Sequence, residues 1–226
     1  MKIVLFGATG MVGQGVLREC LRDPEVEGVL AVGRTATGRS HRKLREVVRA
    51  DVGDLADLGE ELSAYDACFF CLGVSAAGMD EQDYRRITYD LTLRVAEALA
   101  AHRPGMAFVY VSGAGTDSSE RGRMRWARVK GATENALFRL PLDAYAFRPA
   151  YVQPQHGVTS KTRWYRLAYA VAAPLHPLLR RLAPGLVTTT ENLGRAMIAV
   201  ARDGWRTRVL PSHDINAAAS ARPPAG

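Results

Sequence analysis

The chain has 226 residues, of which 47% are hydrophobic and 23% are charged, and these proportions are ordinary for a folded globular protein. Its formal net charge is +7, but the arginines are spread from Arg18 to Arg222, and no zinc-finger, helix-turn-helix or aromatic RNA-binding signature accompanies them. We therefore expect a solvated basic surface and no nucleic-acid partner. The three cysteines are too few for a disulfide framework and indicate a reducing compartment.

The sequence shows no signal for secretion or for crossing a membrane. Its first residues already form a strand-like run at 2–6, so we expect no signal peptide. No apolar run approaches the roughly 18 to 20 residues that a spanning helix needs, so we expect no integral membrane segment. The expected localisation is cytoplasmic, and the expected assembly is a monomer or a homodimer.

Short apolar runs alternate with helix-periodic segments, which is the pattern of a parallel sheet covered on both faces. The expected strands are 2–6, 28–32, 46–49, 67–72, 107–112 and 144–148, with a last strand near 207–210. The expected helices are 13–21, 83–101, 127–139 and 191–202, with Thr190 as the cap of the last one and a further short helix at 55–62. The sequence thus predicts an α/β Rossmann fold, with a doubly wound parallel sheet, over residues 1–214.

Two segments near the C-terminus depart from this alternation of strand and helix patterns. Residues 155–184 place aromatic and aliphatic side chains among arginines, and several prolines interrupt them. A helix on a membrane surface is one interpretation, but we favour a small excursion that covers the substrate side of the sheet. Residues 215–226 are rich in Ala, Ser and Pro and keep no apolar period, so we expect a disordered tail there.

Three glycines, Gly7, Gly10 and Gly13, follow the first expected strand and open the first expected helix. In a dinucleotide-binding loop the first glycine allows a sharp turn, the second lets the backbone approach a pyrophosphate, and the third packs the helix on the strand. The free N–H groups and the dipole of that helix then hold the phosphate charge. An ordinary turn would not need three glycines at this interval, so we predict that the loop, with Thr9, Met11 and Val12, binds a dinucleotide.

At these residues the sequence resembles the short-chain dehydrogenase/reductase superfamily, in particular its extended and atypical branches, which include NmrA-like and Tat-interacting-oxidoreductase-like proteins. The likeness continues along almost the whole chain. The resemblance implies a nicotinamide dinucleotide cofactor and further residues around it. These are Arg34 at the end of the second strand, the adenine-contacting pair Asp51 and Val52, Leu72 and Gly73 after the fourth strand, Ser112 at the end of the fifth, Lys130 in the lysine helix, and Tyr151 and Val152 in the turn that meets the nicotinamide.

The residue that closes the second strand distinguishes the two dinucleotides. An acid there pairs with the ribose hydroxyls of NAD, whereas an arginine accommodates the 2′-phosphate of NADP. Arg34 occupies this place, about twenty residues beyond the last glycine, and a guanidinium matches phosphate geometry. We therefore expect NADP(H), with NAD(H) as the alternative, since it can bind without an acidic partner.

The resemblance also implies a catalytic Tyr-x-x-x-Lys pair, but this sequence has Trp126 four residues before Lys130. An indole cannot act as acid or base near neutral pH, so ordinary ketone reduction is in doubt, although Ser112 and Lys130 remain the catalytic candidates. Three interpretations stay open. The protein reduces a hydrophobic carbonyl or quinone-type acceptor, or another group supplies the proton, or it is a non-enzymatic NADP(H) sensor or scaffold. The candidates for another proton donor are Tyr84, Tyr89, Tyr151 and His156.

Cys68 and Cys71 have the spacing of a redox or zinc motif. Positions three apart on a strand point to opposite faces, however, so the two sulfurs cannot meet. No second pair of cysteines or histidines completes a metal site. We expect two core thiols and no metal.

Overall fold

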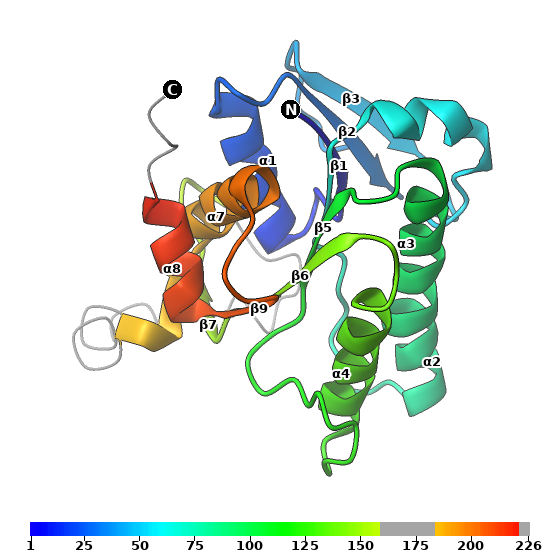
Figure 1. Ribbon diagram of the computed structural model, residues 1–226, viewed down its shortest axis with the longest axis vertical. Coiled ribbons are helices and arrows are strands. Elements are labelled where there is room, and N and C mark those ends of the chain that lie inside the picture. Colours follow the sequence, from blue (N-terminus) through cyan, green and yellow to red (C-terminus); the bar gives the residue numbers. More distant parts are fainter. Residues whose placement is uncertain (159–183, 222–226) are drawn as a thin grey trace.

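The computed structural model describes residues 1–158 and 184–221. Nearly all of the segment expected to cover the substrate, at 155–184, lies outside the described residues. Within them, seven parallel strands form the central sheet in the order β3-β2-β1-β4-β5-β6-β9 (Figure 1). Their bounds are Lys2–Phe6 (β1), Gly28–Gly33 (β2), Leu44–Val48 (β3), Ala67–Phe70 (β4), Ala107–Val111 (β5), Asp143–Arg148 (β6) and Val209–Pro211 (β9). The predicted doubly wound parallel sheet is confirmed.

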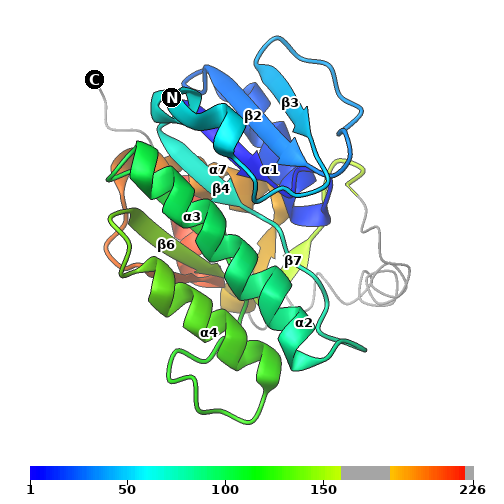
Figure 2. The same cartoon turned by 90° about the vertical axis from the view of Figure 1, so that its right-hand side faces the viewer.

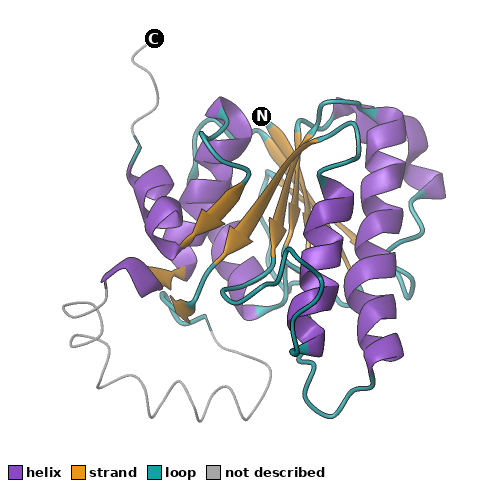
Figure 3. Ribbon diagram, turned by 60° about the horizontal axis from the view of Figure 1, so that its bottom comes forward, coloured by secondary structure: helices purple, strands orange, loops and turns teal. Residues whose placement is uncertain are grey.

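Helices cover both faces of this sheet, and alternate strand residues point into two separate apolar layers (Figure 3). On β1, for example, Ile3 and Leu5 face one layer while Val4 and Phe6 face the other. The first layer is closed by α1 (Met11–Arg22), α7 (Thr190–Asp203) and α8 (Ser212–Ser220). The second is closed by α3 (Leu91–His102) and α4 (Arg125–Leu137), which lie in front of the sheet in Figure 2 together with α2 (Glu81–Arg85). Burial on both faces explains why the strands read as continuous apolar runs.

The strand order reverses between β1 and β4. From β1 the chain moves outward through β2 to β3, and then returns to pair β4 with the other side of β1 before continuing to β5 and β6. In open parallel sheets, ligands bind outside the carboxyl ends of the strands at such a reversal. The fold therefore directs attention to the loops that follow β1 and β4.

Some predicted elements have different bounds or types. The helix expected at 83–101 is built from α2, a π-helical turn η2 (Arg86–Asp90) and α3. The short helix expected at 55–62 is the 3₁₀ segment η1 (Ala56–Ala64). A second, two-stranded sheet of β7 (Tyr151–Gln153) and β8 (Val187–Thr189), the latter preceded by the 3₁₀ turn η4 (Pro184–Leu186), was not expected.

Two predictions near the C-terminus are wrong. The disordered tail expected from residue 215 instead begins as part of α8, because Ile215 and Ala218 are buried against the sheet and small alanines allow the helix to pack closely on α7. The remaining tail residues 222–226 lie outside the described part of the chain. The cap of α7 is Thr189, whose side chain accepts the Asn192 N–H at 2.9 Å. No helix in the described ranges is long and apolar enough to span a bilayer.

Candidate dinucleotide-binding site

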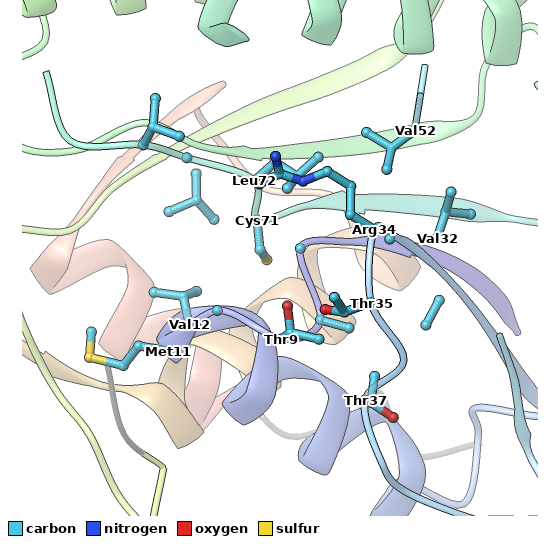
Figure 4. Close-up of a pocket in the computed structure, with 18 of the residues that line it drawn as sticks. Thr9, Met11, Val12, Val32, Arg34, Thr35, Thr37, Val52, Cys71 and Leu72 are labelled. Carbon is cyan, nitrogen blue, oxygen red and sulfur yellow. The ribbon is translucent and has the colours of Figure 1, made fainter. Parts of the chain in front are cut away.

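A cavity of about 930 Å³ opens at the carboxyl ends of β1, β2, β4 and β5, where the strand order reverses (Figure 4). Its size suits a ligand of several hundred daltons. It brings together residues that lie far apart in the sequence, and most of the predicted site residues are among them. These are Gly7, Thr9, Gly10, Met11, Val12, Arg34, Val52, Leu72, Gly73, Ser112 and Lys130.

The glycine loop is packed so tightly that side chains are excluded at two positions. Gly7 has φ +82°, and a Cβ there would lie 2.7 Å from the carbonyl carbon of Cys71. A Cβ on Gly13 would lie 2.0 Å from the Gly7 carbonyl oxygen. Gly13 itself is buried behind the cavity wall. The loop thus holds the start of α1 directly against the end of β1, as a pyrophosphate-binding turn requires.

The first turn of α1 presents its backbone amides to the cavity. The N-cap residue is Gly10, which has no side chain to bond these amides, while its own N–H donates to the Gly7 carbonyl at 3.0 Å. The first N–H groups of a helix have no partner within the helix and carry the positive end of its dipole. Gly10, Met11 and Val12 all line the cavity. This arrangement fits a diphosphate.

At the opposite end of the cavity, the segment after β2 supplies polar side chains. Arg34, Thr35 and Thr37 line this end, and Figure 4 shows Arg34 turned toward Leu72. Arg34 is exposed and takes part in no ion pair within the described residues. Sequence reasoning missed Glu46 of β3, which lines the same end. A lone acid in a strand gives no signal until the register of β2 and β3 is known.

Asp51 lies next to the cavity and outside its lining, whereas Val52 is part of the lining. The Asp51 Oδ1 accepts hydrogen bonds from Arg94 at 2.8 Å and from the Gly53 N–H at 3.0 Å. These bonds fix the carboxylate and use one of its two oxygens. Within the described residues the other oxygen accepts no hydrogen bond and can accept one from an amino group of a ligand.

Lys130 and Ser112 meet at the inner end of the cavity. The Lys130 ammonium donates a hydrogen bond to the Ser112 carbonyl oxygen, and both residues line the cavity. Burial lowers the pKa of Lys130 from 10.5 to about 8, against the opposing effect of the Glu134 carboxylate. The Ser112 hydroxyl donates to the Phe147 carbonyl at 3.2 Å. An amine with this pKa is largely cationic at neutral pH and can donate hydrogen bonds to a polar ligand.

Helix α4, which carries Lys130, is fixed by two close contacts. A Cβ on Gly131 would lie 1.8 Å from the Asp117 carbonyl oxygen, so the loop after β5 packs directly on the helix. One turn further on, the fully buried Glu134 accepts from the Arg148 Nε at 3.0 Å, which ties α4 to the end of β6. Such a buried pair is sensitive to the loss of either partner. Together these contacts set the position of Lys130.

Trp126 lies one turn before Lys130 on α4 and packs over Gly115, where an added Cβ would lie 3.3 Å from the indole ring. Trp126 is not part of the cavity lining, and neither are the residues expected as alternative proton donors. Tyr84 is buried, Tyr89 lies under the Arg85 guanidinium, and His156 bonds Glu191 at 2.6 Å. Tyr151 and Val152, expected near the nicotinamide, form β7 and are not in the lining either.

The two cysteines of the Cys-x-x-Cys spacing lie on opposite faces of the sheet, which confirms that their sulfurs do not meet. Cys68 is buried in the layer under α3, and Cys71 packs against the layer under α1 while it also lines the cavity. Burial raises the pKa of the Cys71 thiol to about 12. The thiol is therefore neutral at physiological pH.

Replacing Gly13 with alanine is expected to abolish ADP binding measured by calorimetry, because no side chain fits 2.0 Å from the Gly7 carbonyl oxygen. Gly28→Ala is the matched control, since its Cβ would meet only atoms at 3.9 Å. Circular dichroism establishes that both variants are folded. Wild-type affinity in a folded Gly13→Ala protein would contradict the assignment of the loop.

The lowered pKa of Lys130 predicts a dependence of stability on pH. Between its folded pKa of about 8 and its ordinary value of 10.5, the unfolded chain binds a proton that the folded chain lacks, so stability gains with rising pH. The unfolding free energy of the wild type, relative to that of Lys130→Met, should rise by about 1 to 3 kcal/mol from pH 7 to pH 10. Denaturant titrations measure this difference in unfolding free energy. A difference that stays constant from pH 7 to pH 10 would refute the lowered pKa of Lys130.

Comparisons with known proteins agree with the geometry. The profile of the NAD dependent epimerase/dehydratase family matches residues 3–122, more than half of the chain. The Bordetella bronchiseptica enzyme WbmF, solved in complex with NAD+ and UDP, superposes with a TM-score of 0.66 at 17% identity, over 93% of this chain and 70% of that one. MoeE5, solved with UDP-glucose and NAD, superposes with a TM-score of 0.63 at 19% identity, over 93% and 75%.

Two curated relatives are fungal. Protein fmp52, mitochondrial, of Emericella nidulans is 25% identical over 204 residues, which cover 87% of this chain and 85% of the relative. The Chaetomium globosum protein of the same name is 25% identical over 161 residues, 69% and 67% of the two chains. Because both are named as mitochondrial, the cytoplasmic localisation expected from the sequence is contradicted. The resemblance to short-chain dehydrogenases/reductases is confirmed: the chain belongs to the NAD dependent epimerase/dehydratase family, an extended branch of that superfamily with an NAD(P)-binding Rossmann fold.

Proposed function

We propose that the protein is an NADP(H)-dependent oxidoreductase that reduces a hydrophobic carbonyl or quinone-type acceptor. The observation that carries this proposal is that one cavity is lined by the glycine loop, Arg34, Ser112 and Lys130. When bound there, the nicotinamide supplies the hydride. The fold and the family support a nicotinamide dinucleotide, and Arg34 supports the phosphorylated form.

Each part of the cofactor has residues that suit it. The open amides at the start of α1 hold the pyrophosphate. Arg34, with the hydroxyls of Thr35 and Thr37 beside it, binds the 2′-phosphate. The cationic Lys130 binds the hydroxyls of the nicotinamide ribose, and its bond to the Ser112 carbonyl keeps it at the inner end of the cavity.

The proposed acceptor class is based on the apolar residues of the cavity lining. Leu72, Val74, Met79 and Val111 are among them, and they favour an apolar compound. Trp126 stands where a proton-donating tyrosine is expected, and an indole does not exchange its proton near neutrality. Quinones and other conjugated carbonyls depend less on a precisely placed proton donor than simple ketones do. They are therefore the acceptor class that we propose.

A second function, an NADP(H) sensor or scaffold without turnover, is favoured by one set of observations. Trp126 replaces the tyrosine, and Tyr84, Tyr89 and His156 lie outside the cavity lining. A chain that keeps the cofactor residues and lacks a positioned proton donor can bind the dinucleotide and signal its redox state to a partner.

Replacing Arg34 with aspartate tests the cofactor assignment. NADPH binding should weaken by about 2 kcal/mol through the loss of a charge-assisted contact, and NADH binding should change much less. Arg39→Asp in the same loop is the control, because Arg39 is exposed and outside the cavity lining. Fluorescence titrations give both affinities. Equal losses for NADPH and NADH would refute a 2′-phosphate site at Arg34.

Turnover distinguishes the two proposed functions. The wild type is expected to oxidise NADPH with quinones and not with simple ketones. The loss of NADPH absorbance measures this oxidation. Trp126→Tyr should add ketone reduction, because a phenol one turn before Lys130 restores a proton donor. If the wild type binds NADPH tightly and oxidises it with no acceptor of the panel, the oxidoreductase proposal fails in favour of the sensor.

A further inference from the structure

Glu46 of β3 is an acidic residue in the wall of the cavity. In the parallel pairing of β2 with β3 it lies in register with Ala31, and both line the cavity. Its strand neighbour Val47 packs into the layer under α3, so Glu46 points to the opposite face, where Ala31 packs under α1. The carboxylate therefore lies on the same side of the sheet as the helix whose N-terminus faces the cavity.

A short hydrogen bond joins this carboxylate to the segment that follows β2. Glu46 Oε1 accepts the backbone N–H of Thr37 at 2.7 Å, which is the distance of a charge-assisted bond. The bond holds the loop that carries Arg34 against β3. Glu46 thus influences this end of the cavity through the position of the loop as well as through its charge.

The charge of Glu46 is not neutralised within the described residues. No lysine or arginine among them lies within 4.0 Å of its carboxylate, and Arg34 likewise has no acidic partner there. One cation and one anion, neither of them paired, consequently line the same end of the cavity. Their effects on a nucleotide differ, because a 2′-phosphate is attracted by Arg34 and repelled by Glu46, whereas a free 2′-hydroxyl can donate to a carboxylate.

We infer that Glu46 is a second cofactor-specificity residue, which opposes the 2′-phosphate and limits the preference for NADP(H) that Arg34 provides. In dinucleotide-binding folds that select NAD, an acid at the end of the second strand has this effect. In this chain the neighbouring strand supplies the acid. The inference rests on the proposed function, since it concerns the cofactor end of the same cavity.

Glu46→Gln removes the charge and keeps an oxygen that can accept the Thr37 N–H. NADPH binding is expected to tighten about tenfold, which corresponds to ~1.4 kcal/mol, while NADH binding stays the same or weakens slightly. The gain should shrink at high salt, because screening reduces the repulsion that the wild type experiences. Glu97→Gln, on the exposed side of α3, removes the same charge outside the cavity lining and should leave both affinities unchanged.

The outcomes separate this inference from the proposal on which it rests. If wild type and Glu46→Gln bind both dinucleotides with the same NADPH to NADH affinity ratio, Glu46 does not select the cofactor and the inference alone is overturned. An equal gain in Glu97→Gln would assign the effect to net charge and overturn it as well. If the wild type binds neither dinucleotide, the proposed function itself fails, and the inference fails with it.

Discussion

The close approach of Gly13 to the Gly7 carbonyl is the constraint on which the site depends. With 2.0 Å between that oxygen and the place of a Cβ, only glycine lets α1 begin directly at the end of β1. The amides of its first turn then face the cavity at the point where the strand order reverses. The same packing directs α1 along the sheet, where Val16 and Leu17 are fully buried. The fold and the proposed phosphate site therefore depend on the same close contact.

The rest of the site is held by contacts made away from the ligand. Gly131 lets the loop after β5 pack on α4, and the buried Glu134 carboxylate bonds Arg148 at the end of β6. These contacts place the Lys130 ammonium against the Ser112 carbonyl. At the opposite end of the cavity, Glu46 holds the loop that carries Arg34 through the Thr37 amide. Helix α4 and strand β3, on either side of the reversal, thus define the two ends of one cavity.

The sheet and its main helices could be predicted because their signals are local. Strands buried on both faces are continuous apolar runs, and the glycine spacing marks the turn into α1. The register of β2 with β3 could not be predicted, and Glu46 was missed with it, because pairing is a long-range property. Helix α8 was missed because its alanines resemble a low-complexity tail, and only the burial of Ile215 and Ala218 against the sheet makes them a helix face. The sequence also could not predict that Tyr84 and Tyr89 lie outside the cavity lining, because their positions depend on tertiary packing.

The central claim is that unpaired amides at the start of α1 bind a diphosphate. Amide resonances of isotope-labelled protein, followed by nuclear magnetic resonance during titration with ADP and separately with adenosine, test it most directly. The account predicts that the amides of residues 11–13 shift strongly with ADP and little with adenosine, since only ADP carries the diphosphate. Unchanged amide positions in this turn at saturating ADP, or shifts confined to another surface, would contradict the account.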